Sequence, residues 1–93
     1  MYEKFGQFID GKWHQSSDKG TYEVINPANE EVLGHASKAT PKDVEAALQS
    51  AAKGLQVWKR TAPWQRSNII RKVADKIREK QDVLAKWMTL EVG

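Results

Sequence analysis

The sequence predicts an α+β chain in which short antiparallel strands come first and helices follow. Before about Thr40 the chain is rich in glycine, asparagine and β-branched residues, and its short segments are separated by turn signals. After Thr40, apolar residues recur at spacings of three and four, which is the period of an amphipathic helix. We therefore expect a hairpin at 7–14, strands near 21–25 and 31–37, and helices near 41–59, 63–79 and 82–91.

The clearest turn signal is Asp10-Gly11, which separates residues 8–9 from residues 12–13. A type I′ turn needs positive φ at both central residues, and Asp and Gly adopt positive φ most readily. Further on, the β-branched and aromatic segment 21–25 is ended by Asn26-Pro27, because proline lacks a backbone donor. In the next strand, strict alternation places Val32, Gly34 and Ala36 on one face and Leu33 and His35 on the other.

The first helix has a well-marked start at Thr40-Pro41-Lys42-Asp43. A hydroxyl at the N-cap, a proline at the first helical position and a carboxylate three residues after the cap together predict a capping box. One apolar stripe then runs down the helix through Val44, Ala47, Leu48, Ala51, Leu55 and Trp58.

A second proline, Pro63, marks the start of the second helix. Its apolar stripe contains Ile69, Ile70, Val73, Ala74 and Ile77. The stripe fails at Lys80-Gln81 and resumes on a new phase, so we expect a break between Glu79 and Asp82, with Asp82 as the N-cap of a third helix. The sequence therefore predicts two antiparallel helices and a shorter third one.

The composition fits one small domain. The chain has 93 residues, 29% of them charged, and a net charge of +3 that comes from interspersed basic and acidic residues, which is typical of a solubility feature. Without cysteine, the chain offers no disulfide, no thiolate metal site and no thiol nucleophile. No apolar run is long enough for a spanning helix or a signal peptide, so we expect a cytoplasmic protein that does not bind membranes.

Local motifs indicate no active site. His14 and His35 lie in different strand regions without a helix-spaced acidic partner, so a zinc site is not expected. The glycines form neither a dinucleotide fingerprint nor a phosphate loop. Basic residues near tryptophans offer a nucleic-acid surface as one interpretation, but interspersed acids favour a solvated helix face. These basic residues are Arg66, Arg71, Lys72, Lys76, Arg78 and Lys80.

An ordered set of landmarks, however, resembles a known family. The first part of the set comprises residues 8–13 and 24–34, Thr40, Asp43-Val44 and Ala46-Ala47, and the second comprises Trp58, Arg66, 70–77, Leu84-Ala85 and 88–93. In this order, they are similar to the amino-terminal segment of the NAD(P)-dependent aldehyde dehydrogenases. The match covers essentially the whole chain. It leaves open whether the succinate semialdehyde or the betaine aldehyde type is the nearer one.

The resemblance implies a much larger subunit of the α/β, Rossmann-like aldehyde dehydrogenase fold. Residues 1–93 would form the amino-terminal part of its cofactor-binding domain, with no separate second domain. In that family a cysteine thiolate attacks a small aldehyde, hydride passes to NAD or NADP, and water releases the acid. No catalytic or cofactor-binding residue is carried over to this chain, which is expected to be inactive and to bind no cofactor by itself. Its implied partners are the remainder of the subunit and further copies in a homo-oligomer.

The resemblance also implies one metal site. Some members hold a monovalent cation with backbone carbonyls before the Asn-Pro turn and a carboxylate near the end of the third helix, which corresponds to Val24, Ile25 and Glu91 here. Carbonyl and carboxylate oxygens suit a hard cation. The competing interpretation is that the carbonyls bond only to backbone and that Glu91, longer than the aspartate of some members, is an ordinary surface residue.

A second class of function stays open at this stage. The chain could be a self-standing interaction or scaffold module that has no enzymatic activity. Its amphipathic strands and helices have one-sided apolar faces that need a partner layer, so we expect it to be marginally stable or oligomeric on its own.

Overall fold

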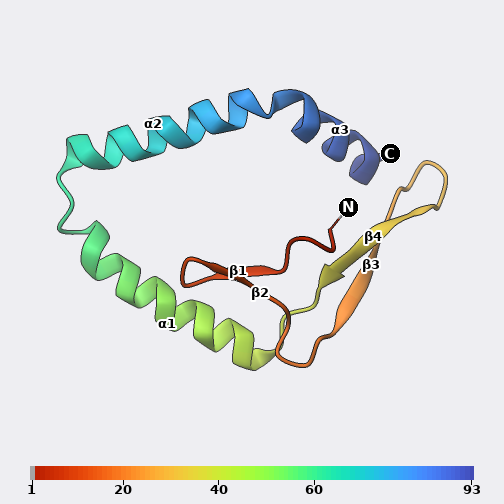
Figure 1. The fold of residues 1–93 in the computed structure, drawn as a ribbon, viewed down its shortest axis with the longest axis horizontal. Helices are drawn as coiled ribbons and strands as arrows, with labels where there is room; N and C mark the ends of the chain where they lie inside the picture. Colours follow the sequence, from red (N-terminus) through yellow and green to blue (C-terminus); the bar gives the residue numbers. More distant parts are fainter. Residues whose placement is uncertain (1) are drawn as a thin grey trace.

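A computed structural model describes residues 2–93 as four strands followed by three helices. In Figure 1 the three helices follow one another along an open curve. The hairpin of β1 and β2 lies inside this curve, and β3 and β4 lie at its open side. The radius of gyration is 16.5 Å, whereas a compact domain of this length would have about 12 Å. The predicted order of strands and helices is confirmed, but the elements do not close around a common centre.

The first hairpin consists of β1 (Gln7–Ile9) and β2 (Lys12–His14), which pair antiparallel. Asp10 and Gly11 have φ of 53° and 75°, so both central residues have the positive φ of the expected type I′ turn. At the open end of the hairpin, a side chain at Gly6 would collide with the carbonyl oxygen of His14. Glycine is required there because the backbone of the next strand lies too close.

The second hairpin consists of β3 (Thr21–Ile25) and β4 (Val32–Ser37), again antiparallel. Val24 pairs with Gly34 but Ile25 pairs with Val32, so β4 contains one extra residue at this point. Adjacent residues of β3 point to opposite faces, and Val32 and Gly34 therefore do so as well. The expectation that Val32, Gly34 and Ala36 share a face is wrong for Val32, because the bulge shifts the alternation by one residue.

Helix α1 (Pro41–Trp58) begins with the expected capping box. The Thr40 hydroxyl accepts a hydrogen bond from the Asp43 backbone N–H at 3.2 Å, and the Asp43 carboxylate accepts one from the Thr40 N–H at 2.9 Å. These two bonds satisfy backbone donors that the first turn of a helix would otherwise leave free.

The break in the helical half lies at Lys80, between α2 (Pro63–Glu79) and α3 (Gln81–Val92). Lys80 has φ of −105° and ψ of 14°, and it is the N-cap of α3 without a side-chain hydrogen bond. The expectation of Asp82 as the N-cap is therefore wrong. Asp82 instead lies in the first turn of α3, where its negative charge interacts favourably with the positive end of the helix dipole.

The apolar stripes of α1 and α2 do not pack on each other. Figure 1 shows the two helices diverging from the turn at 59–62. Leu48 and Leu55 of α1 are 61% and 56% exposed, and Ile70 of α2 is 60% exposed. The expected antiparallel helix pair is therefore not formed, although each helix is present.

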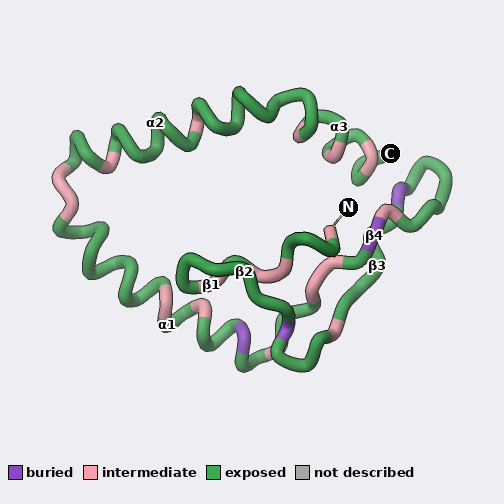
Figure 2. Tube along the Cα trace, in the orientation of Figure 1, coloured by how far each residue is buried: buried purple, intermediate pink, exposed green. Residues whose placement is uncertain are grey.

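Among the described residues, no hydrophobic side chain is buried. The buried polar residues are Ser16, Asn26 and Asp43, all in the first half of the chain. Figure 2 shows that most residues of the three helices are exposed. Since hydrophobic burial is the main favourable term in folding, residues 2–93 lack the core that an independently stable domain needs.

Candidate functional site

The predicted cation ligands Val24 and Ile25 lie at the end of β3, directly before a tight turn. Asn26 closes this turn: its N–H donates to the Glu31 carbonyl at 2.9 Å, and its own carbonyl accepts from the Glu30 N–H at 2.8 Å. The Asn26 peptide groups thus face β4. Because peptide groups alternate in direction along a strand, the Ile25 carbonyl faces away from β4 and the Val24 carbonyl faces toward it.

The third predicted ligand, Glu91, lies in the last turn of α3. Its carboxylate accepts a short hydrogen bond from the Tyr2 hydroxyl. Desolvation, and then this bond to Glu91, raise the pKa of Tyr2 to about 12, so the hydroxyl keeps its proton at neutral pH. One carboxylate oxygen of Glu91 is engaged in this contact and the other has no hydrogen bond or ion pair within residues 2–93.

The end of α3 and the turn after β3 lie against each other. A Cβ built on Gly93 would be 3.1 Å from the Ala28 nitrogen and 3.4 Å from the Pro27 Cβ. Gly93 also has φ of 91°, a conformation that glycine adopts without strain. The structure thus brings the helix end that carries Glu91 close to the segment that follows Val24 and Ile25.

The most highly connected polar group in the first half is the Asp43 carboxylate. Besides the Thr40 N–H, it accepts hydrogen bonds from the Ser17 N–H at 3.2 Å and the Gln7 side-chain amide at 3.2 Å. The Ser16 hydroxyl lies 3.2 Å away and shares its one proton between Asp43 and Asp18, which is nearer at 2.8 Å. These donors come from β1 and from the segment between β2 and β3. The Thr40 N–H, followed by the Ser17 N–H, holds the pKa of Asp43 well below its usual range, so the carboxylate is ionised throughout the neutral range.

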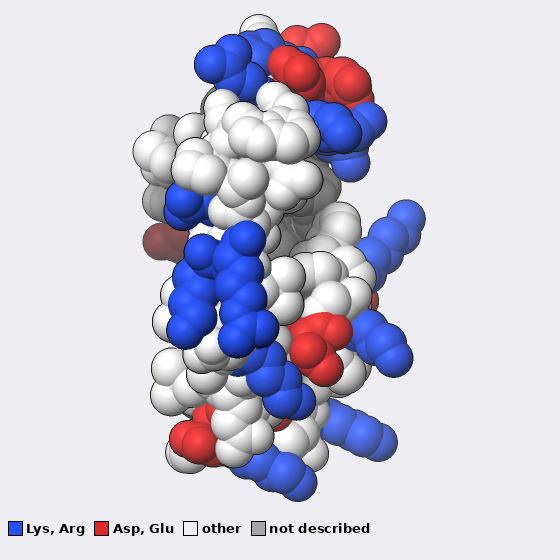
Figure 3. Space-filling model, turned by 90° about the vertical axis from the view of Figure 1, so that its left-hand side faces the viewer, with Lys and Arg blue, Asp and Glu red and all other residues white. Residues whose placement is uncertain are grey.

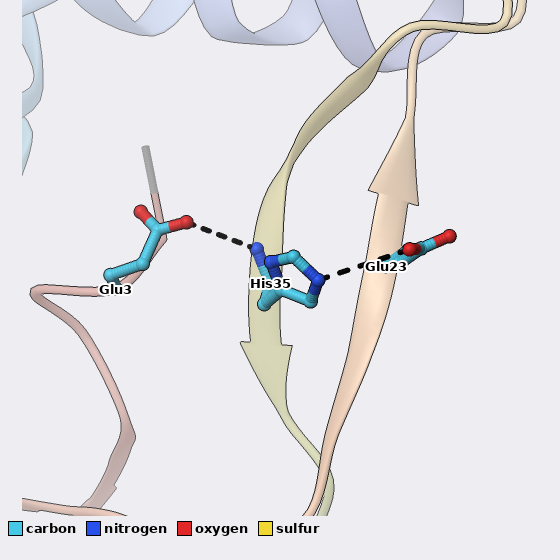
Figure 4. Close-up of polar contacts among 3 residues, drawn as sticks. All are labelled: Glu3, Glu23 and His35. Atoms are coloured by element: carbon cyan, nitrogen blue, oxygen red, sulfur yellow. Dashed lines mark hydrogen bonds and ion pairs between the residues drawn. The ribbon is translucent and has the colours of Figure 1, made fainter.

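The two histidines form no site with each other. Figure 4 shows His35 between Glu3 and Glu23: its backbone N–H donates to Glu3 at 3.2 Å, and its Nε2 lies 3.9 Å from a Glu23 carboxylate oxygen. The His35 and Glu23 side chains are 50% and 58% exposed, so water screens this pair. Over residues 2–93, no group of three or more His, Cys, Asp or Glu side chains is arranged to hold a metal ion.

A row of aromatic rings joins the amino-terminal segment to both the first hairpin and α3. The Phe5 ring centroid lies 5.4 Å from that of Trp13 and 5.8 Å from that of Trp87, and Tyr2 lies 6.4 Å from Trp87. Phe8 continues the row at 5.1 Å from Trp13. These separations are those of favourable aromatic pairs, and the row is the main apolar contact between the two ends of the chain.

Two of these features were missed in the sequence. Asp43 was expected only as part of the capping box, and its bonds to Gln7, Ser16 and Ser17 depend on a loop that returns to the helix start. The Tyr2–Glu91 bond links residues 89 positions apart, and no local pattern signals it.

None of the helices in the described part of the chain is long and apolar enough to cross a membrane.

Comparison with known proteins gives one family. The profile of the "Aldehyde dehydrogenase family" matches residues 13–93. The structure is similar to betaine aldehyde dehydrogenase of Staphylococcus aureus in complex with NAD+, with a TM-score of 0.87 and 37% sequence identity over 91% of this chain. A point mutant of that enzyme, also with NAD+, gives the same TM-score and identity. The chain spans 17% of the length of the first of these chains and 18% of the second.

Proposed function

Because the chain belongs to the aldehyde dehydrogenase family, we propose that it forms the amino-terminal part of the cofactor-binding domain of an NAD(P)-dependent aldehyde dehydrogenase. The observation that carries this proposal is the match over 91% of the chain to an enzyme with bound NAD+, at 37% identity. The exposed apolar stripes of α1 and α2 agree with it, because they require cover from further polypeptide.

The proposed reaction of the whole subunit is oxidation of an aldehyde to a carboxylic acid. A cysteine thiolate adds to the aldehyde, hydride leaves to the nicotinamide of NAD(P), and water hydrolyses the resulting thioester. Residues 1–93 contain no cysteine, so the nucleophile belongs to other polypeptide. The role proposed for these residues is to support the cofactor-binding domain, with α1 to α3 as part of its outer layer.

The experiment is an NADH assay on two proteins. The subunit that contains this segment should form NADH from NAD and an aldehyde, and the purified 93-residue chain should form none. Absence of NADH from the subunit with every aldehyde tried would reject the proposed activity. Sustained turnover by the 93-residue chain would reject the proposal that it is inactive alone, and would favour a self-standing function.

The substrate class proposed is the betaine aldehyde type, because the similar solved structures are betaine aldehyde dehydrogenases. Betaine aldehyde is cationic whereas succinate semialdehyde is anionic, so their kcat/KM values separate the two types clearly. A higher kcat/KM for succinate semialdehyde would overturn this assignment. A homo-oligomeric enzyme in the cytoplasm completes the proposal, and sedimentation of the subunit and cell fractionation test these two points.

We also propose that the carbonyls of Val24 and Ile25, together with the carboxylate of Glu91, hold a monovalent cation. The supporting observations are the contact of Gly93 with Pro27-Ala28 and the outward direction of the Ile25 carbonyl. The Val24 carbonyl faces β4, so it would bind the ion through its second lone pair. The bound cation would fix the end of α3 against the turn that follows β3.

Thermal unfolding of the subunit in potassium, sodium and N-methylglucamine chloride tests this site. The unfolding temperature should be higher with one alkali ion than with the organic cation, and Glu91→Gln should abolish the difference. Tyr2→Phe is the matched control, because it removes the bond to Glu91 but leaves the carboxylate. Equal unfolding temperatures in all three salts would rule the site out.

A further inference from the structure

The junction of α2 and α3 contains an apolar groove of about 530 Å³. Its floor is formed by Ile69, Val73, Ile77 and Leu84, and its edge by Lys72, Lys76 and Lys80. The three lysines are four residues apart, so they follow one side of α2 for just over two turns. The groove is thus an apolar channel with a basic border.

Nothing within residues 2–93 covers this floor. Val73 and Ile77 are 53% and 55% exposed, and Ile69 is 47% exposed. The three floor residues of α2 recur at i, i+4 and i+8, which is the spacing that receives one face of a second helix. The shape of the groove therefore fits a helix better than a flat surface such as a lipid bilayer.

The basic border is only partly neutralised. Lys76 bonds to Glu79 at 3.1 Å, whereas Lys72 and Lys80 form no ion pair within the described residues. Successive residues of a helix are turned by about 100° around its axis, and this places Asp75 and Glu79 on the side of α2 away from the apolar stripe. Figure 3 looks toward the turn between α1 and α2, and on this face lysine and arginine side chains cover more of the surface than acidic side chains do.

Arg66 gives a second indication of what is absent from this face. It lies one turn before Ile69 and Ile70, and its Nε is buried without a hydrogen-bond partner among the described residues. A buried donor that lacks an acceptor is costly, so native structures almost always provide one. Because this nitrogen is already enclosed, an acidic or carbonyl-bearing segment on this face would supply the acceptor together with a change of the Arg66 rotamer.

We propose that the groove receives an acidic amphipathic helix from the polypeptide that completes the enzyme subunit. Apolar side chains of that helix fill the space between Ile69 and Leu84, and its Asp or Glu side chains pair with Lys72 and Lys80. This inference rests on the proposed function, since the enzymes that the chain resembles are more than five times its length. A second copy of α2 is a poor occupant because it would bring its own lysines against these.

Carbodiimide cross-linking of the whole subunit tests this inference. The reagent joins a lysine amine to a carboxylate only when the two are in contact, and peptide mass spectrometry identifies both residues. Lys72 and Lys80 should be joined to Asp or Glu residues outside positions 1–93 of the same subunit. Lys42 and Lys53 of α1, which are exposed and form no ion pair within the described residues, are the matched control and should give no such product.

A pair of substitutions separates the groove from general surface charge. Val73→Asp places a charge on the apolar floor and should abolish the cross-links of Lys72 and Lys80. Val57→Asp on α1, where Val57 is 71% exposed, should leave them unchanged. The cross-link map of the unsubstituted subunit is decisive by itself, so the inference stays testable even if Val73→Asp fails to fold.

The outcomes separate this inference from the proposed activity. Cross-links within α2 only, cross-links to residues 1–93 of a second copy, or no products from Lys72 and Lys80 would each overturn it, even if the subunit forms NADH. The expected cross-links in a subunit that forms no NADH would support the helix docking and reject the activity.

Discussion

The start of α1 and the α2–α3 arm (residues 63–92) differ in the contacts that fix their positions relative to the rest of the chain. Around Asp43, donors from three separate parts of the sequence converge on one carboxylate: Gln7, Ser16 with Ser17, and Thr40. We call these five residues the polar joint. In α2, by contrast, the side-chain hydrogen bonds and ion pairs of the described residues join positions three or four apart.

This difference shows which parts of the geometry the chain can fix by itself. A polar joint can fix the angle between a loop and a helix without a core, because a few directional bonds suffice. Within the described residues, the arm has its own helical hydrogen bonds, the ring contacts of Trp87 and the single hydrogen bond from Tyr2 to Glu91. Its position in the complete protein therefore depends on apolar cover, whereas the position of the α1 start does not.

Loss of the central carboxylate should have the largest effect. Asp43→Ala leaves the N–H groups of Ser17 and Thr40 without their acceptor, so their hydrogen exchange in the whole subunit should accelerate about a hundredfold. Asp75→Ala removes a carboxylate that bonds only to Arg78 within α2 and should leave these two amides unchanged. Unaltered exchange in Asp43→Ala would show that the polar joint does not hold this part of the chain.

The same joint predicts a pH dependence. The pKa of Asp43 is lowered in the folded chain by the Thr40 N–H and further donors, whereas an unfolded Asp has a pKa of about 3.9. The stabilisation is therefore fully present above about pH 4 and is lost as the pH falls from there toward the lower folded pKa. Amide exchange at Ser17, corrected for its intrinsic pH dependence, should show this loss below pH 4 and none between pH 5 and 8.

Trp87 is the contact on which the position of α3 depends most. Trp87→Ala removes the ring contacts to Tyr2 and Phe5 and should destabilise the whole subunit by about 2 kcal/mol. Trp64→Ala is the control, because Trp64 is 65% exposed and forms no aromatic pair with another described residue; its effect should stay within about 0.5 kcal/mol. Urea unfolding followed by far-ultraviolet circular dichroism measures both, and equal effects would contradict the assigned role of Trp87.

The helix cap should contribute less than either of these. Thr40→Ala removes the side-chain acceptor of the Asp43 N–H and should cost about 1 kcal/mol. Thr40→Ser keeps the hydroxyl and should recover most of that loss in the same urea experiment. If serine were no better than alanine, the cap would owe its effect to the methyl group and not to the hydrogen bond.

The smallest effect is expected from an ion pair on the arm. The Lys76 and Glu79 side chains are 72% and 60% exposed, so Lys76→Ala should change the free energy of unfolding by only about 0.3 kcal/mol. A loss above about 1 kcal/mol would contradict the view that the arm lacks stabilising polar contacts of its own. Raising the salt concentration should remove even this small difference.

The sequence by itself determined the local elements. Asp10-Gly11, Thr40 with Asp43, and Pro63 each fixed a turn or a helix start, because turn and cap chemistry involves only residues close together in the chain. The spacing of the apolar residues predicted the ends of the strands and helices to within one or two residues of those observed. The ordered landmarks also indicated the aldehyde dehydrogenase family, which the match over residues 13–93 confirms.

Only the tertiary structure decided how these elements meet. The bonds of Asp43 to Gln7 and Ser17 join segments that are distant in sequence. The bulge opposite Val24 and Ile25 and the divergence of α1 from α2 depend on how neighbouring elements pair and pack. An apolar period states that a face will be buried but not what buries it. On α1 and α2 that face is exposed. The residues of a helix set its apolar face, but the burial of that face depends on other segments that pack against it.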